Sequence, residues 1–332
     1  MFMHPLFVTV LLTAALSFTF APLAYADDLF NAIPEPTQEL MVPVEGGKVY
    51  VRINGELSSK TLPAVFIHGG PGGRHNFFSR LIGLADERAI ILYDQLDSGK
   101  SEQPNDPNNW RVERFVQELE AIRIKLDIEQ WHIVGHSWGA AIALEYSVRY
   151  PERVGSTVFG GTFISTSHWV KDANLLIGRA SKLVQETLFS CESKTPPSKE
   201  ECQEAFRNLY SKYYTPVPVG KEIVDYDVKT GGTKFNSKIY NAMWGPSEFS
   251  SSGSLLTYDG IGHLAKLDGK RTMFIVGQYD SARVDTVQDY VTMTPGAELS
   301  IIPGGSHGYI KDRPMETEAI LRGWFRRNKR ED

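Results

Sequence analysis

Ser137 stands in a sequence context that makes a serine hydroxyl reactive. It is the central residue of segment 135–139, G-H-S-W-G, which follows a short apolar run at 131–134 and precedes a helical pattern at 138–150. A sharp turn from a strand into a helix presents the hydroxyl at the edge of a sheet, and the helix N-terminus favours developing negative charge. The pattern predicts a nucleophile, and the alternative is a purely structural turn.

A serine nucleophile needs a base to take its proton and an acid to orient that base. Of the eight histidines, His307 follows a late apolar run, at 299–302. Asp280 follows the preceding apolar run, at 273–276. The chain order serine, aspartate, histidine is typical of α/β enzymes whose nucleophilic serine lies in a strand-to-helix turn. We therefore predict a triad of Ser137, Asp280 and His307. The alternative is that Asp280 and His307 are loop residues whose hydrogen bonds have only a structural role.

A glycine-rich segment is a candidate for binding an oxyanion. Residues 68–73, H-G-G-P-G-G, follow the apolar run 64–67 and let the main chain approach a substrate closely. We predict an oxyanion hole made by the amides of Gly70 and Trp138, the second being the amide that follows the nucleophile. A plain turn and a phosphate-binding loop are the alternatives. A dinucleotide fingerprint counted from Gly70 fails, because its last position is His75.

The composition narrows the class of partner. The 332 residues contain 35 Lys and Arg against 40 Asp and Glu, a formal net charge of −5. Because there is no basic surplus to neutralise phosphates, we expect no nucleic-acid partner. The expected partner is a small-molecule or short-peptide substrate, and the sequence specifies no oligomeric state.

We expect neither a cofactor nor a metal ion. The segment S-G-K-S at 98–101 ends like a phosphate-binding loop, but the first glycine of that pattern would fall on Asp94. The sequence also lacks an H-E-x-x-H pattern and clustered cysteines. Nucleotide binding and metal catalysis therefore have no support in the sequence.

Short apolar runs alternate with helical patterns along most of the chain. Runs buried on both faces are typical of parallel strands covered by helices. They follow an expected hairpin of strands 40–44 and 48–53, and they lie at 64–67, 89–93, 131–134, 154–159, 273–276 and 299–302. Helical patterns at 112–127 and 138–150 separate some of them. With the serine turn, this predicts an α/β-hydrolase fold, a mostly parallel central sheet flanked by helices.

The alternation stops between residues 163 and 262. This stretch is largely helical and aromatic, with proline and glycine pairs between its helical parts. We predict that 163–262 is a cap domain inserted into a hydrolase core of residues 27–162 and 263–332. An insertion after a strand lies at the carboxyl edge of the sheet, where such folds bind ligands, so the cap should cover the site. The charged segment 326–332 is expected to be a solvated tail.

The first 26 residues are predicted to be a cleaved signal peptide. Residues 7–21 are nearly all apolar, and A-Y-A at 24–26 offers a cleavage site. The alternative is a membrane anchor, but the apolar run is shorter than the roughly 20 residues that span a bilayer. We therefore expect a secreted or periplasmic protein without a stable membrane anchor after cleavage.

Cys191 and Cys202 are the two cysteines of the chain and are separated by ten residues. An exported protein meets an oxidising environment, which favours a disulfide between them. The alternative is a pair of buried free thiols.

Four segments together resemble the proline iminopeptidase family of α/β-hydrolase serine peptidases. Residues 68–73 are similar to its H-G-G-P-G loop, 94–101 to its D-Q-x-G-x-G-x-S segment, and 135–139 to its G-H-S-W-G turn. In the cap, G-P-S-E-F at 245–249 is similar to the family's G-P-x-E-F motif, whose glutamate binds the free amino terminus of the substrate. The resemblance implies that Glu248 pairs with a substrate ammonium, and the alternative is a surface or helix-capping glutamate.

The residues and the resemblance together predict an exported serine hydrolase. It is expected to release an N-terminal residue, of the proline type, from short peptides or aminoacyl amides through an acyl-enzyme. One alternative keeps the triad but acts as an esterase, lactonase or amidase on small non-peptide substrates. An alternative of another class is a non-catalytic receptor that binds a small ligand under the cap. Hydrolysis of N-acetylated substrates distinguishes the first alternative, and failure of a fluorophosphonate to label Ser137 distinguishes the second.

Overall fold

The structure, a computed structural model, describes residues 33–58, 60–193, 195–213, 225, 229 and 235–329. The predicted signal peptide at 1–26 lies outside the described residues. Within the described part of the chain, no helix has the length and apolar character needed to cross a membrane.

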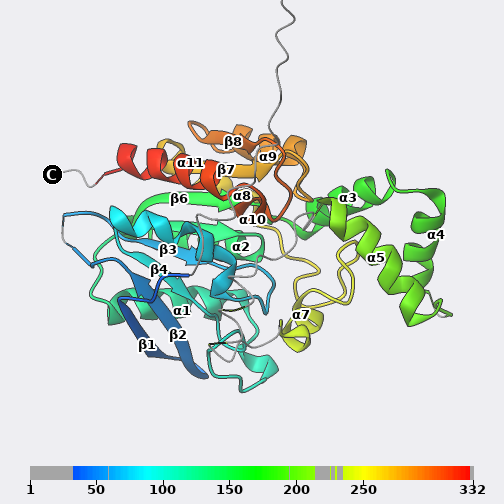
Figure 1. Ribbon diagram of the computed structural model, residues 1–332, viewed down its shortest axis with the longest axis horizontal. Helices are drawn as coiled ribbons and strands as arrows, with labels where there is room; N and C mark the ends of the chain where they lie inside the picture. Colours follow the sequence, from blue (N-terminus) through cyan, green and yellow to red (C-terminus); the bar gives the residue numbers. More distant parts are fainter. Residues whose placement is uncertain are drawn as a thin grey trace, which may run out of the picture. The chain divides into compact units, whose positions relative to one another are not determined.

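Eight strands form a single sheet in the order β1-β2-β4-β3-β5-β6-β7-β8 (Figure 1). Strand β2 is antiparallel to β1 and β4, and the remaining neighbouring pairs are parallel. The strands are β1 (Gln38–Val44), β2 (Gly47–Asn54), β3 (Ala64–Ile67), β4 (Ile90–Tyr93), β5 (Trp131–His136), β6 (Val154–Gly160), β7 (Thr272–Gly277) and β8 (Glu298–Ile302). The predicted hairpin and all the predicted apolar runs are strands, so the predicted fold class is confirmed.

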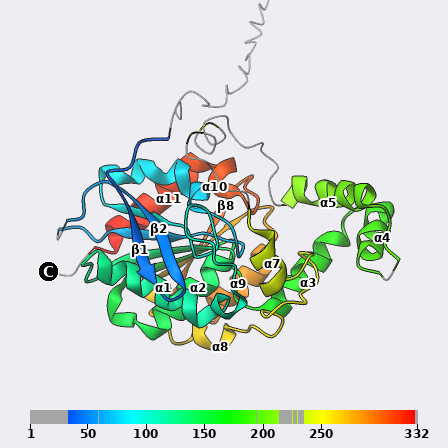
Figure 2. The same cartoon turned by 90° about the horizontal axis from the view of Figure 1, so that it is seen from below.

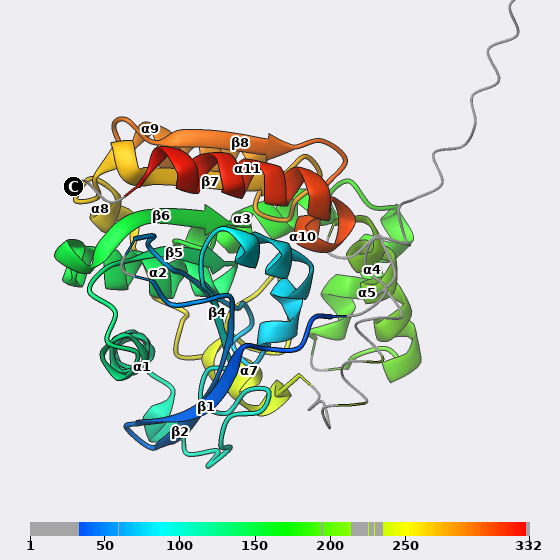
Figure 3. The same cartoon turned by 60° about the vertical axis from the view of Figure 1, so that its left-hand side comes forward.

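Helices cover both faces of the sheet. One face carries α1 (Val112–Lys125), α2 (Trp138–Arg149) and α9 (Val284–Thr292), and the other carries the 3-10 helix η2 (His75–Asp86), α10 (Tyr309–Asp312) and α11 (Pro314–Arg327). Figure 3 shows α11 running along β8, which it contacts. Short turns complete the core: η3 (Pro107–Asn109), η4 (Pro151–Arg153), α8 (Ile261–Leu264) and η5 (Gly269–Arg271).

Strand β3 shows why these runs are continuously apolar. Val65 and Ile67 pack in the cluster that includes α1 and α2, whereas Ala64 and Phe66 pack in the cluster that includes η2 and α11. Successive side chains of a strand point to opposite faces. Because both faces are covered, every residue of β3 is buried, and a polar residue would be costly at any of these positions.

The charged end of the chain differs from the solvated tail that we expected. Arg326 and Arg327 form the last turn of α11. The guanidinium of Arg326 contacts the carboxylate of Glu87, and Arg327 Nη2 lies 2.7 Å from Glu298 Oε2. Cations are favoured at a helix C-terminus, and Leu321, Trp324 and Phe325 of α11 are buried. The helix therefore continues into the charged segment.

In the described part of the insertion between β6 and β7, four helices lie within the predicted cap, 163–262. They are α3 (Thr166–Ile177), α4 (Lys182–Cys191), α5 (Lys199–Tyr213) and α7 (Ser237–Met243). Helices α4 and α5 pack side by side beyond α3 (Figure 2).

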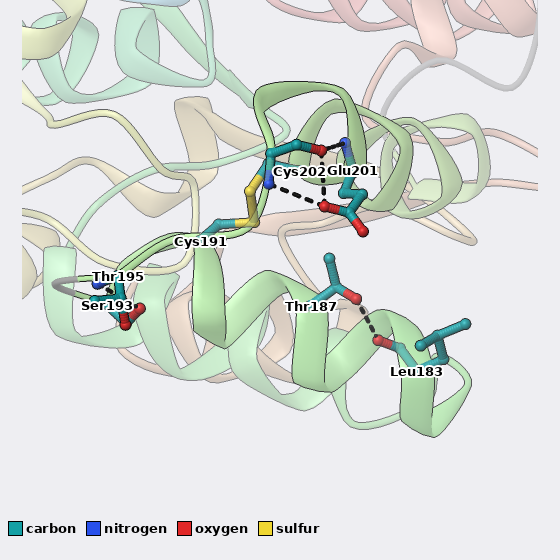
Figure 4. Close-up of a disulfide and its surroundings, with 8 residues drawn as sticks. Leu183, Thr187, Cys191, Ser193, Thr195, Glu201 and Cys202 are labelled. Atoms are coloured by element: carbon teal, nitrogen blue, oxygen red, sulfur yellow. Dashed lines mark hydrogen bonds between the residues drawn. A yellow bond between two sulfur atoms is a disulfide. The ribbon is translucent and has the colours of Figure 1, made fainter.

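A disulfide joins Cys191 at the end of α4 to Cys202 in the first turn of α5 (Figure 4). The start of α5 is also capped by a reciprocal pair of hydrogen bonds. Glu201 N donates to Ser198 Oγ at 3.2 Å, and Ser198 N donates to Glu201 Oε2 at 2.9 Å. This capping box defines where α5 begins, and the disulfide ties that point to α4.

Candidate active site

Ser137 lies in a strained turn between β5 and α2. Its backbone has φ 56° and ψ −123°, a conformation that residues other than glycine rarely adopt. Its amide donates to the carbonyl of Gly160 at 2.8 Å, which ties the turn to β6. A Cβ on Gly135 would lie 2.2 Å from the carbonyl oxygen of Gly139, so glycine is required there. Strain of this kind persists where the surroundings over-determine it, and it is concentrated at functional sites.

His307 and Asp280, which follow β8 and β7, are brought into contact at the carboxyl edge of the sheet. The Nδ1 atom of His307 lies 2.8 Å from Asp280 Oδ1. The Asp280 side chain is fully buried and also accepts from the amides of Ala282 at 2.9 Å and Gly277 at 3.3 Å. A carboxylate only accepts, so Nδ1 carries the proton and Nε2 of the neutral ring is left as a proton acceptor.

The backbone of His307 is held from two sides. Its amide donates to the carbonyl of Tyr213, the last residue of α5, at 2.9 Å. Its carbonyl lies 2.8 Å from Nε2 of His136, and because a carbonyl only accepts, His136 donates through Nε2. Gly161 has φ 49°, and a Cβ there would lie within 2.9 Å of both imidazole rings. Only glycine at this position lets the two histidines approach each other.

The two residues predicted to donate to the oxyanion belong to the same site as Ser137. Gly70 and Trp138 both line the cavity described below. Trp138 is the first residue of α2, where an amide has no partner within the helix. A Cβ on Gly69 would lie 2.9 Å from Ser137 Cβ, so only glycine at position 69 lets the loop lie this close to the serine.

Gln95 links the two segments of the predicted oxyanion hole, a contact that the sequence analysis did not identify. Its Oε1 accepts from the indole of Trp138 at 2.9 Å, and its Nε2 donates to the carbonyl of His68 at 2.8 Å. The glutamine therefore ties the start of α2 to the loop after β3. Its only signal in the sequence was the D-Q pair within 94–101.

A cavity of about 370 Å³ lies over the serine. Its described lining residues come from the loops at the sheet edge and from the cap: His68, Gly69, Gly70, Pro71, Gly73, Arg74, Phe77, His136, Ser137, Trp138, Phe163, Trp169, Phe235, Tyr240, Trp244, Glu248, Leu255 and His307. Sequence analysis did not identify Phe163, Phe235 or Leu255, because an apolar cap residue can face either the cavity or the packed interior. The volume and the aromatic walls suit a small organic ligand.

Glu248 lies in this cavity, half-buried, and its carboxylate is held by two cap residues. Trp169 Nε1 donates to Glu248 Oε2 at 3.3 Å, and the hydroxyl of Tyr240 donates to Oε1. The ring of Trp169 also contacts the ring of His307, with centroids 5.4 Å apart. Trp169 therefore contacts both Glu248 and His307, so the glutamate lies near the His307–Asp280 pair rather than on the outer surface.

A second histidine–aspartate pair is present away from the cavity. Nδ1 of His75 lies 2.9 Å from Asp94 Oδ2, and both side chains are almost fully buried. Asp94 also accepts from the amide of His75 at 2.6 Å and from the amide of Lys100 at 2.8 Å. Neither His75 nor Asp94 lines the cavity among its described residues. This pair therefore ties the loop after β3 to the segment after β4, and it lies outside the described cavity lining.

Three buried histidines are held neutral. Burial lowers the pKa of His68 to about 4, although nearby Asp94 opposes the shift. Burial, together with Arg88, lowers the pKa of His132 to about 3. Burial and the neighbouring His307 hold the pKa of His136 well below its usual range.

These shifts predict that the fold loses stability in acid. A histidine in the unfolded chain takes up a proton near pH 6.5, so below that pH the unfolded state binds more protons than the folded state. The contribution of each histidine is complete above pH 6.5 and falls as the pH drops towards 4, by about 1.4 kcal/mol per pH unit. Urea unfolding should be measured at pH 7 and at pH 4.5. Between these two pH values, the free energy of unfolding should fall by less in His132→Gln than in the parent protein.

The matched control is His263→Gln, because the His263 side chain is 34% exposed beside Glu145. An identical pH slope for the parent and His132→Gln would contradict the assignment of a buried neutral ring to His132.

Comparisons with known proteins agree with this architecture. Residues 63–195 match the family model of the alpha/beta hydrolase fold. A proline iminopeptidase of Heyndrickxia coagulans is 33% identical over 283 residues, which cover 85% of this chain and 96% of that protein. A proline iminopeptidase of Lactobacillus helveticus is 32% identical over 297 residues, with 86% and 96% covered.

A crystal structure gives the same result in three dimensions. The proline iminopeptidase of Mycobacterium smegmatis matches with a TM-score of 0.78 and 26% identity, covering 88% of this chain and 98% of that chain. Sequence and fold agree over most of both molecules, and the chain therefore belongs to the proline iminopeptidase family of α/β-hydrolase serine hydrolases.

Proposed function

We propose that this protein is a serine aminopeptidase that releases an N-terminal residue, of the proline type, from short peptides or aminoacyl amides. The observation that carries the proposal is the carboxylate of Glu248 in the same cavity as Ser137 and His307. The relatives named above as proline iminopeptidases support the same activity.

In the proposed reaction, Ser137 Oγ attacks the carbonyl carbon of the first peptide bond. Nε2 of His307 takes the hydroxyl proton as the bond forms, and Asp280 holds the ring in the required tautomer and stabilises the imidazolium. The amides of Gly70 and Trp138 donate to the oxyanion. His307 then protonates the leaving amine, the C–N bond breaks, and an acyl-enzyme remains. Water, deprotonated by His307, hydrolyses this ester and regenerates Ser137.

Glu248 explains why cleavage would begin at the amino terminus. A substrate ammonium is attracted to a half-buried carboxylate more strongly than in water, because the local dielectric constant is lower. The aromatic rings of Phe163 and Trp244 line the same cavity and offer apolar surface to a proline ring. A blocked amino terminus would lose the charge pair and would add an acyl group to a space lined by these rings.

Glu248→Gln is the variant that tests this role, because it removes the charge and keeps the shape. We expect kcat/KM for a proline anilide to fall about 100-fold, since one partner of an enclosed, hydrogen-bonded charge pair is lost. Hydrolysis of the N-acetylated anilide should be slow in the parent and should change little in the variant. Steady-state kinetics on both compounds measures the effect.

Glu186→Gln is the matched control, because this residue is 63% exposed on α4, and it should behave as the parent protein. Equal turnover of free and N-acetylated substrates by the parent would contradict the proposal and favour an esterase, lactonase or amidase. Failure of a fluorophosphonate to label Ser137 in folded protein would favour a non-catalytic receptor.

We also propose that the protein is exported and that cleavage after residue 26 removes a signal peptide. The apolar run 7–21 and the A-Y-A sequence at 24–26 support this, and the disulfide between Cys191 and Cys202 suits an oxidising compartment. N-terminal sequencing of protein recovered from the periplasm or medium should begin at Asp27. Cytoplasmic protein that retains residues 1–26 would contradict export.

A further inference from the structure

Two residues of opposite charge line the cavity, one from the cap and one from the core. Among the described lining residues, Glu248 is the only Asp or Glu and Arg74 is the only Lys or Arg. Glu248 belongs to the cap, whereas Arg74 belongs to the loop after β3, which carries the predicted oxyanion donor. The other lining residues are histidines, glycines, aromatic and aliphatic residues and the serine. A ligand that fills the cavity therefore lies against one cap residue that carries a carboxylate and one core residue that carries a guanidinium.

The backbone at Arg74 is firmly positioned. The amide of Gly73 donates to the carbonyl of Gly69 at 3.3 Å, which folds the chain before Arg74 back onto the glycine beside Ser137. On the other side, the amide and ring of His75 are both bonded to the buried Asp94. Arg74 itself is extended and half-buried at the start of η2. Its guanidinium is thus carried on a rigid loop that also contacts the nucleophile turn.

From these positions we infer that Arg74 binds the carboxylate of the leaving residue, so that the preferred substrates are dipeptides. The inference rests on the proposed aminopeptidase function and extends it to the leaving side of the scissile bond. With the ammonium at Glu248 and the carbonyl at Ser137, the leaving residue would extend away from the cap residue Glu248, toward the core residues of the cavity, which include Arg74. In a dipeptide that residue ends in a carboxylate, whereas in a longer peptide or a peptide amide it does not.

The chemistry of the guanidinium suits this role. Arginine offers five donors in a planar fork that matches a carboxylate, so it binds one even while another group occupies part of the fork. The cavity volume of about 370 Å³ is near the lower end of the roughly 300–1,000 Å³ found for small-molecule sites. Both features favour a short zwitterionic substrate over an extended chain.

The test compares prolyl-alanine with prolyl-alaninamide, which differ in the terminal carboxylate. In the parent protein, kcat/KM should be about 10- to 100-fold higher for prolyl-alanine, the value of hydrogen bonds to a charged group. In Arg74→Gln this ratio should fall to near one, mainly through KM, and Arg74→Lys should keep part of it. Arg179→Gln removes the same charge at an exposed position of the cap and should leave the ratio unchanged.

A third substrate, proline 4-nitroanilide, separates failure of this inference from failure of the proposed function. If the parent hydrolyses the anilide but shows no preference for prolyl-alanine, Arg74 has no such role and the aminopeptidase stands. The same conclusion follows if Arg74→Gln lowers hydrolysis of the dipeptide and its amide equally. If the parent hydrolyses none of the three compounds, the proposed function fails and the inference fails with it. The comparison within the parent protein is valid whether or not a variant folds.

Discussion

Replacement of Ser137 by alanine should lower kcat for a proline anilide about 10⁴- to 10⁶-fold. In the proposed reaction this hydroxyl forms the acyl-enzyme, and alanine has no nucleophilic group to take its place. The residual rate would come from substrate binding and the oxyanion donors alone. The measurements are steady-state hydrolysis and labelling by a fluorophosphonate, which should be lost with the activity.

The matched control is Ser167→Ala, which removes a hydroxyl from an exposed position of α3 and should keep both activity and labelling. The thermal unfolding midpoint of Ser137→Ala should remain close to that of the parent, because alanine keeps the Cβ and adopts the same backbone. Activity within tenfold of the parent would show that Ser137 is not the nucleophile.

Asp280→Asn should lower kcat about 10⁴-fold with little change in volume. The asparagine amide turns its NH₂ group toward Nδ1 of His307, which then accepts, so that Nε2 carries the proton and no longer acts as a base. The neighbouring amides of Ala282 and Gly277 would also compete for the single remaining amide oxygen. Steady-state kinetics across pH measures the loss.

Two other carboxylates serve as controls for Asp280. Asp285 on α9 is 79% exposed and bonded to Arg283, so Asp285→Asn should retain full activity. Asp94 is also paired with a histidine. For Asp94→Asn, the loss of unfolding free energy should exceed the rise in activation free energy calculated from kcat per folded molecule. A 10⁴-fold loss of kcat in folded Asp94→Asn, with Asp280→Asn active, would reverse the assignment of the two pairs.

The sequence alone predicted the elements that carry the proposed chemistry, because their signals are local. A continuous apolar run predicts a strand that is covered on both faces, and the strands found at 64–67, 131–136 and 272–277 follow such runs. The serine turn depends on a strand, a few glycines and a helix that are adjacent in the chain. Asp280 and His307 were identifiable because each follows a strand, and the ends of parallel strands meet at one edge of the sheet.

Only the tertiary structure decided which cap residues face the cavity and what they touch. Trp169 and Glu248 are 79 residues apart and His136 and His307 are 171 apart, and no local pattern encodes such contacts. Phe163 lines the cavity whereas Phe189 is 52% exposed on α4, although both are aromatic residues of the same insertion. The periodicity of a helix or strand indicates that a side chain is buried. Which residues contact that side chain is determined by the packing of segments that are distant in the sequence.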